Sequence, residues 1–328
     1  MSSPTAAEFG TLPAVDLDNG ILRLRVVPDL GGRVVSLVDL RTGREWLVQG
    51  APPTRRELSA WRRESAVFGG REAFGWDECL PTVAPCLGPL EPFGPPLRDH
   101  GGQWARPTVI VAPPPGSDGE LRLRWFDRRL PFHLDRSLRL DGARIEASYA
   151  LMNASCDPLP TLWSMHALLD VEPGSRIELP PGTALCMTQG IGMELDSLRR
   201  GATVTWPVAR GSADVDLSVI RDASVGLAAK LYADPAPPGP ISVRTPDGAR
   251  LAFQWSRDVA PAVGVWIDNG GWPTGAGLSQ LAIEPTTSGH DDLQAAIRDR
   301  RARVLEAGER LTWEVSIAVE AARTVGAT

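Results

Sequence analysis

The chain contains four histidines, and one of them, His166, lies within the otherwise apolar segment LWSMHALLDVEPG at residues 162–174. An imidazole has an unperturbed pKa of about 6.5, so it can gain or lose a proton near neutral pH, and its charged form is costly to bury. Such a histidine either makes a structural hydrogen bond inside the core or transfers a proton in a site. We treat His166 as a candidate site residue, the alternative being a core histidine with a satisfied hydrogen bond.

A carboxylate stands in a comparable position late in the chain. Glu284 follows the apolar run 281–283 and directly precedes Pro285. Alternation along a strand places Ala282 and Glu284 on one face, and proline cannot donate to a sheet ladder, so we expect strand pairing to end there. Glu284 is therefore predicted to line a pocket, the alternative being a surface carboxylate at a strand end.

Two further segments carry candidate binding groups. His100 precedes two glycines in DHGGQW, where the backbone can approach a ligand closely, although a simple polar turn has the same composition. The segment GWDECLP supplies Trp76, Asp77 and Glu78. An indole ring can stack on a sugar and carboxylates accept its hydroxyl protons, so these three residues are predicted to bind substrate.

The elements that must position these residues are mainly strands, because the dominant hydrophobic period is two. Helical patterning is scarce, the best case being residues 288–302, where Ser288 is the expected N-cap. We predict an all-β fold, one large antiparallel β-sandwich with a few short helices, forming a single domain over residues 1–328. The clearest alternating runs and hairpin turns are at residues 21–27, 121–125, 141–142, 247–248 and 311–319.

Composition limits the partners. The 328 residues are 43% hydrophobic and 23% charged, as in soluble globular proteins, and a net charge of −6 disfavours nucleic acid as a partner. The four cysteines have no C-x-x-C spacing, which argues against a zinc cluster or disulfide framework and for a reducing cytoplasm. Neither a secretory signal nor a membrane-spanning run is recognisable, and no dinucleotide or P-loop glycine motif is present, so neither a metal nor a cofactor is expected.

The order of the segments resembles the aldose 1-epimerase family, the galactose mutarotase-like proteins. The resemblance runs from about residue 20 to 320 and is carried by GGRVVSLVDLRTGREWL, GWDECLPTVAP, DHGGQWAR, NASCDPLPTLWSMHALLDVEPG and LAIEPTTSGHDD. Each piece is weak by itself, and their common order makes the match specific. The resemblance implies the large antiparallel sandwich called a supersandwich.

The resemblance also implies roles for particular residues. The general acid falls on His166, the general base on Glu284 and a second, substrate-holding histidine on His100, while a sugar-binding arginine is matched by Arg71. The family's sugar-gripping aspartate has no matching motif. Asp216 and Asp268 are the candidates for its role.

The implied reaction interconverts the two anomers of a hexose or modified hexose. A base takes the proton of the anomeric hydroxyl while an acid protonates the ring oxygen, and the ring opens. The substrate would be a small-molecule sugar. Arg71, Arg98 and Arg106 lie in segments expected at the pocket rim, which suggests a sugar with an anionic group.

Two other functions remain open. One is a non-catalytic carbohydrate-binding or sensing protein, for which the 11 tryptophans would serve equally well. The other is a sugar-cleaving enzyme or lyase, which ranks last because a hydrolase needs two carboxylates flanking the bond and this pair is one Glu and one His. The identity of the sugar, the anomeric preference and the oligomeric state stay open, a homodimer being one alternative.

Overall fold

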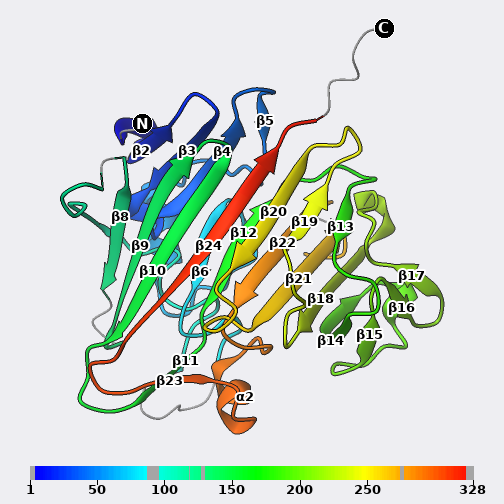
Figure 1. Ribbon diagram of the computed structural model, residues 1–328. Coiled ribbons are helices and arrows are strands. Elements are labelled where there is room, and N and C mark those ends of the chain that lie inside the picture. The colour runs from blue at the N-terminus through cyan, green and yellow to red at the C-terminus, as the bar shows by residue number, and fades with distance from the viewer. Residues whose placement is uncertain (1–3, 87–95, 118, 127–129, 274–276, 323–328) are drawn as a thin grey trace, which may run out of the picture.

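The computed structural model describes residues 4–86, 96–117, 119–126, 130–273 and 277–322. Its main feature is two large antiparallel β-sheets packed face to face (Figure 1). One continuous hydrophobic core lies between them, formed for example by Leu24 and Ile283 from the larger sheet and by Phe253 and Val315 from the smaller. The predicted all-β sandwich is confirmed.

The larger sheet is made of 14 strands among the described residues. In spatial order these are β1 (Thr5–Phe9), β2 (Leu12–Asp18), β3 (Leu22–Val27), β4 (Arg33–Asp39), β6 (Trp76–Cys79), β12 (Ser164–Leu169), β22 (Ser279–Thr286), β21 (Ala262–Asn269), β18 (Leu227–Ala233), β14 (Ala184–Ile191), β15 (Thr203–Thr205), β16 (Val208–Arg210) and β17 (Asp214–Asp216), with β5 (Arg44–Glu45) beside β4.

The second sheet has eight strands in the same described part of the chain. Their order is β13 (Arg176–Glu178), β19 (Ile241–Arg244), β20 (Arg250–Trp255), β24 (Arg310–Glu320), β10 (Arg144–Asn153), β9 (Phe132–Asp141), β8 (Leu121–Phe126) and β7 (Val109–Val111). The remaining elements are the strand pair β11 (Leu159–Thr161) and β23 (Arg303–Leu305), the helices α1 (Arg55–Trp61) and α2 (Leu293–Arg298), and the 3-10 turns Pro28–Leu30, Met193–Leu195 and Ala223–Val225.

The second sheet follows the predicted alternation closely. In β24 every second side chain from Leu311 to Val319 is buried. The β9–β10 hairpin turns at Asp141-Gly142, with Asp141 paired to Arg144 and Gly142 at a φ of 55°, a conformation that favours glycine. The period-two pattern therefore located these strands correctly.

The central strands of the larger sheet are buried on both faces, because one face packs on the second sheet and the other is covered by loops. Met165, Ala167 and Leu169 of β12 belong to the main core. Leu168, two positions from His166, belongs to a separate apolar cluster on the opposite face. His166 therefore points away from the sandwich core although its strand is buried.

Two local expectations were wrong. The N-cap of α2 is Asp292, whose side chain accepts from the Ala295 N–H at 2.6 Å, whereas the Ser288 hydroxyl lies 3.2 Å from His290 Nδ1. Strand β22 also continues through Pro285, which is paired with Val263 on β21. On the β12 side no residue pair forms between Ser164–Thr286 and Leu168–Ala282, so the missing proline N–H disrupts nothing there.

Glu78 and Trp76 face the sandwich core and do not bind substrate from a pocket, so this part of the site prediction was wrong. They occupy alternate positions of β6, and the Glu78 carboxylate accepts from the Trp76 indole at 3.1 Å, Arg136 at 2.8 Å, the Tyr149 hydroxyl at 2.9 Å and the Trp163 indole at 2.8 Å. Burial raises the pKa of the Glu78 carboxyl, although Arg136 opposes this shift. The cluster joins the two sheets.

No helix in the described part of the chain is long and apolar enough to cross a membrane.

We predict that Arg136→Met lowers the free energy of unfolding by about 3–5 kcal/mol, because it leaves the Glu78 carboxylate buried without its cation. The double variant Glu78→Gln/Arg136→Met should lose less than the sum of the two single variants, since it removes the uncompensated charge as well. Urea unfolding of the four proteins measures both quantities. A single Arg136→Met variant within 1 kcal/mol of the wild type would contradict this role.

Candidate active site

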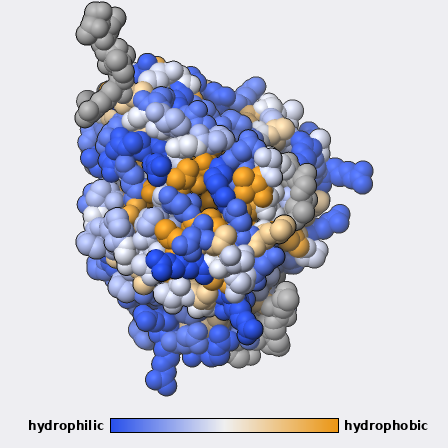
Figure 2. All heavy atoms as spheres, turned by 90° about the vertical axis from the view of Figure 1, so that its right-hand side faces the viewer, coloured by the Kyte–Doolittle hydropathy of each residue, from blue (hydrophilic) through white to orange (hydrophobic). Residues whose placement is uncertain are grey.

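A cavity of about 530 Å³ lies over the central strands of the larger sheet, on the face away from the second sheet. His100, His166 and Glu284 all line it, so the structure brings together the three residues assigned by resemblance to the acid, the base and the substrate-holding histidine. Figure 2 shows a hollow of this character on one face of the molecule, with apolar side chains surrounded by hydrophilic ones. Such a mixture suits a small polar ligand with an apolar face.

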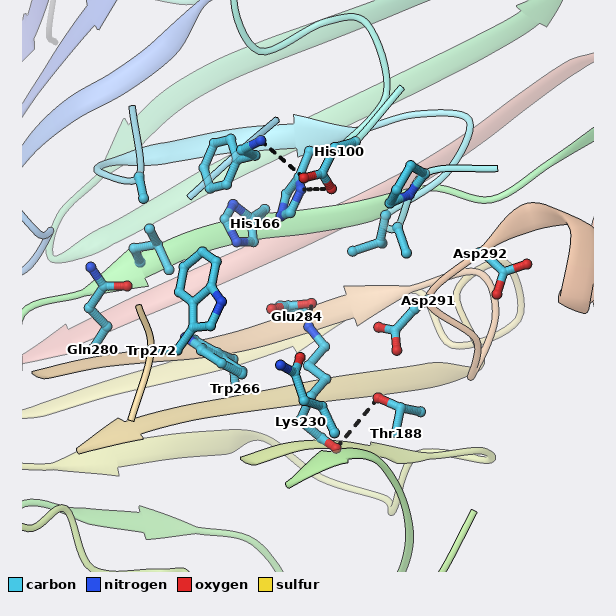
Figure 3. A pocket seen from close by; sticks show the side chains of 18 of the residues that line it. His100, His166, Thr188, Lys230, Trp266, Trp272, Gln280, Glu284, Asp291 and Asp292 are labelled. Atoms are coloured by element: carbon cyan, nitrogen blue, oxygen red, sulfur yellow. Dashed lines mark hydrogen bonds and ion pairs between the residues drawn. The ribbon is translucent and has the colours of Figure 1, made fainter. Parts of the chain in front are cut away.

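The register of adjacent strands assembles the site. On β12 and β22, the pairs Ser164–Thr286 and Leu168–Ala282 bracket His166 and Glu284, which therefore lie side by side on one face. Ala282 pairs with Trp266 on β21, and Trp266 pairs with Lys230 on β18. Four neighbouring strands thus each direct at least one side chain into the cavity, as Figure 3 shows.

His166 is fixed by a buried carboxylate. Its Nδ1 lies 2.8 Å from Asp77 Oδ1, and Arg33 Nη2 donates to the other Asp77 oxygen at 2.7 Å. Burial by itself would raise the pKa of the Asp77 carboxyl, but Arg33 and the hydrogen bond to His166 lower it below its usual value. An ionised Asp77 accepts the Nδ1 proton, so Nε2 is the atom left to exchange a proton in the cavity.

Asp77 therefore acts on His166, and the predicted direct contact with substrate is not what the structure shows. Asp77 does not line the cavity, and its two oxygens are taken by His166 and Arg33. The arrangement resembles the orienting carboxylate of an Asp–His pair, which fixes the tautomer and stabilises the imidazolium.

His100 is held in an equivalent way by its neighbour. Its Nδ1 lies 2.8 Å from Asp99 Oδ1, while Asp99 Oδ2 accepts from the Phe68 N–H at 3.0 Å. His100 has a φ of 56°, and a Cβ on Gly101 would lie 1.9 Å from the Leu80 carbonyl oxygen. The His-Gly turn is thus a strained backbone conformation that presents an imidazole, as the glycines suggested.

The two imidazoles lie close together beneath one phenyl ring. Their centroids are 4.8 Å apart, and Phe68 stacks on His100 at 4.1 Å and meets His166 edge-on at 5.2 Å. These contacts hold both rings in place on one side of the cavity, facing Glu284 (Figure 3).

Glu284 is almost completely buried and has two different oxygens. Oε2 forms an ion pair with the Lys230 ammonium, which also lies 5.2 Å from the centre of the Tyr232 ring. Oε1 has no hydrogen-bond partner among the described residues. Because a buried carboxylate oxygen without a partner is costly, Oε1 is the natural acceptor for a ligand hydroxyl.

Tryptophans supply the apolar wall. Trp266 and Trp272 line the cavity with their rings edge to face at 5.9 Å. Asp268, one of the two candidates for the sugar-gripping aspartate, accepts from the Gly271 and Trp272 N–H groups at 2.8 and 3.1 Å and does not line the cavity. It shapes the turn that carries Trp272, which corrects its predicted role.

The predicted arginines do not reach the cavity. Arg71 is exposed and pairs with Glu57, because Glu72 folds back onto the Gly69 and Gly70 N–H groups and turns Arg71 outward. Arg98 donates to the Trp61 carbonyl at 2.7 Å, and Arg106 pairs with Glu64. The expected preference for an anionic sugar loses its basis.

The charged lining of the cavity is mainly acidic. It comprises four carboxylates and two permanent cations, namely Asp99, Glu284, Asp291 and Asp292 with Lys230 and Arg200. Arg200 is largely exposed and lies 3.8 Å from Asp292. This balance favours a neutral ligand over an anionic one.

Sequence reasoning missed Lys230, Phe68 and the two tryptophans. Lys230 is the single lysine of the chain, and that rarity was the available signal. Its strand is buried throughout and has no alternation to indicate which side chains face a site. Asp216, the other aspartate candidate, lies on β17 and accepts from Ser218, away from the cavity lining.

No family model and no curated protein matches the sequence. Solved structures do match, among them a galactose mutarotase-like protein from Clostridium acetobutylicum, with a TM-score of 0.69 at 13% identity over 98% of both chains. Another galactose mutarotase-like protein, from Lactobacillus casei ATCC 334, has a TM-score of 0.64 at 14% identity, covering 94% of this chain and 100% of that one. A candidate aldose 1-epimerase from Escherichia coli K12 has a TM-score of 0.65 at 15% identity, covering 94% and 98%.

Identities at this level establish the fold. The chain has the galactose mutarotase-like fold, and the resemblance inferred from the sequence is confirmed in that respect.

We predict a pH-dependent effect of Asp268→Asn on stability. Burial raises the pKa of Asp268 to about 6 from an ordinary 3.8, so the folded protein binds this proton more tightly than the unfolded chain does. The resulting stabilisation is present below about pH 4 and is lost as the pH rises to about 6. The wild type should lose unfolding free energy over this range relative to the Asn variant. Parallel urea titrations from pH 4 to 7.5 measure the difference, and a constant difference would contradict the assignment.

Proposed function

We propose that the protein is an enzyme of the aldose 1-epimerase type, which interconverts the anomers of a neutral hexose or modified hexose. The observation that carries the proposal is that His166 and Glu284 lie on one face of two adjacent strands. Each has a buried partner, Asp77 for His166 and Lys230 for Glu284. An acid and a base on the same side of one cavity match the requirements of ring opening.

In the proposed reaction, Glu284 Oε1 accepts the proton of the anomeric hydroxyl. The electron pair of that O–H bond forms the aldehyde C=O, the bond between the anomeric carbon and the ring oxygen breaks, and the ring oxygen takes the proton from His166 Nε2. Rotation of the aldehyde group and the reverse proton transfers close the ring as the other anomer. No net atoms or electrons are gained, and both side chains return to their starting protonation states.

The neighbours of each group suit these roles. Asp77 orients His166 through Nδ1, and Lys230 holds Glu284 Oε2 so that Oε1 remains for the substrate. Trp266 and Trp272 would stack on the apolar face of the sugar, while His100 Nε2 would form a hydrogen bond with a hydroxyl. A positioned acid or base contributes typically 10²–10⁴-fold to a rate.

A non-catalytic carbohydrate-binding protein is the second candidate, favoured by one observation. The Lys230 ammonium already contacts Glu284, so this carboxylate has an ion-pair partner in the protein and a structural role that needs no proton transfer. The same cavity would then bind a sugar without turnover. Measuring exchange between anomers, and not binding alone, separates the two functions.

We predict that Glu284→Gln and His166→Asn each reduce anomer exchange by at least about 10²-fold, because each removes one of the two proton-transfer groups. The double variant should be scarcely slower than the slower single variant, since residues acting as a unit are not additive. NMR magnetisation exchange between the anomeric protons, against a panel of neutral and charged hexoses, measures the rate.

Melting temperatures serve as the control for these variants. If His166 had only a structural role, the His166→Asn variant would lose activity only in proportion to the fraction of the protein that is unfolded. A folded, sugar-binding Glu284→Gln that exchanges anomers at the wild-type rate would refute the mechanism.

A separate prediction concerns Lys230, whose ammonium holds Glu284 Oε2 in an ion pair. Lys230→Met should lower the anomer-exchange rate, because it releases the carboxylate from the orientation that presents Oε1 to the substrate, while Lys230→Arg, which can keep the ion pair, should lower it less. Exchange rates of the three proteins at one pH, with melting temperatures as the control, provide the comparison. An unchanged rate in the Met variant would show that the ion pair does not position the base.

A further inference from the structure

A buried thiol lies beside the two cavity histidines. Cys79 is completely buried on β6, two residues after Asp77, so both side chains leave the strand on the same face. One ligand atom from each of Cys79, His100 and His166 lies within 4.8 Å of the others, and no second cluster of this kind occurs within the described ranges. The proposed proton transfers do not use this thiol.

Both imidazoles have the partners that metal-binding histidines usually have. Metal ligands of this type almost always hydrogen-bond through their second ring nitrogen to a carboxylate or carbonyl, which fixes the tautomer and raises basicity. His166 Nδ1 is bonded to Asp77 and His100 Nδ1 to Asp99, both at 2.8 Å. In its neutral form, each ring therefore has a free electron pair on Nε2 that can bind a metal.

The local charge also suits a cation. The carboxylates of Asp77 and Asp99 lie directly behind the two rings, and burial together with the charges of Asp77 and Glu284 raises the pKa of the Cys79 thiol well above its usual value. Arg33 and Lys230 neutralise part of this charge through Asp77 and Glu284. Among the described residues, the Asp99 carboxylate bonds to His100 and to the Phe68 N–H and has no such cation.

We propose that Cys79, His100 and His166 form a binding site for a thiophilic divalent cation of the Zn²⁺ class. Two imidazoles and one thiolate are a ligand set that Zn²⁺ accepts, and three protein ligands leave a fourth position open to the cavity. Zn–N and Zn–S bonds of about 2.0–2.3 Å place tetrahedral ligand atoms roughly 3.3–3.7 Å apart, so atoms that lie within 4.8 Å of one another must close by up to about 1–1.5 Å. Small rotations of the three side chains would supply this movement.

Occupancy of the site would block the proposed reaction. The Cys79 thiol and a protonated His166 Nε2 each give up a proton to solvent when they bind the cation, so His166 has no proton for the ring oxygen. This inhibitory consequence rests on the proposed function, whereas metal binding itself does not. The cation would compete with sugar for the same side of the cavity.

Direct binding is the primary test. Isothermal titration of the full-length, chelator-treated protein with Zn²⁺ should give one site per chain, and Co²⁺ should give tetrahedral ligand-field bands with a sulfur-to-cobalt charge-transfer absorption. Cys79→Ser and Cys79→Ala should each weaken Zn²⁺ binding by at least about 10–100-fold, because that much affinity is lost even when only a residue hydrogen-bonded to a metal ligand is replaced. Both variants should also lack the charge-transfer band. Cys86→Ser, another buried cysteine outside the cluster, is the matched control and should bind as the wild type does.

Equal affinity in the wild type and both Cys79 variants, or a cobalt complex without sulfur ligation, would overturn the proposal.

Inhibition is tested separately by the ratio of exchange rates with and without Zn²⁺ for each protein. A large reduction in the wild type and little in the Cys79 variants is expected. If no sugar is exchanged at all, the proposed function fails while the binding experiment still decides the metal site. Stoichiometric Zn²⁺ without any loss of exchange would overturn the inhibitory part.

Discussion

The site depends on the buried Arg33–Asp77 ion pair. Arg33 donates to Asp77 Oδ2 at 2.7 Å and also to the carbonyls of Glu72 and Phe74, so one guanidinium ties strand β4 to β6 and to the loop before it. Asp77 is thereby kept ionised and aimed at His166. A buried pair of this kind is a weak source of stability, but without Arg33 the carboxylate that fixes the tautomer of His166 would be buried and uncompensated. The ion pair therefore serves mainly to position Asp77 and, through it, His166.

The sequence contained enough to single out His166, Glu284 and the His-Gly turn, because each stands out from a regular pattern: a histidine in an apolar strand, a carboxylate near the end of one, and glycines that permit a positive φ. It could not assign the faces of β6. Alternation shows that Trp76 and Glu78 oppose Asp77, but which set faces the cavity depends on the sheet packed behind the strand. The sequence could not place Lys230 in the cavity either, because its strand pairs with a strand that lies more than 30 residues later in the chain. The single domain, the homodimer alternative, the cytoplasmic location and the absence of nucleic acid stay predictions.

The cavity departs from the pattern that the resemblance implied. Between His166 and Glu284 in sequence, the charged side chains that line the cavity are Arg200 and Lys230, and neither aspartate candidate does so. Lys230 and Glu284 neutralise one another within the site, while the remaining carboxylates make an anionic substrate unfavourable. Specificity would then come from hydroxyl contacts and from the tryptophan wall, in the manner of sites that recognise neutral sugars.

We expect a sugar ring to lie between His166 and Glu284 with its anomeric centre against both. The decisive measurement is a crystal structure of the Glu284→Gln variant with the hexose that it binds most tightly. We predict the ring oxygen within hydrogen-bond distance of His166 Nε2 and the anomeric hydroxyl within hydrogen-bond distance of the residue at position 284, with Trp266 or Trp272 on the apolar face of the ring. A sugar bound with its anomeric carbon directed away from both residues, toward Arg200 and Asp292, would contradict it.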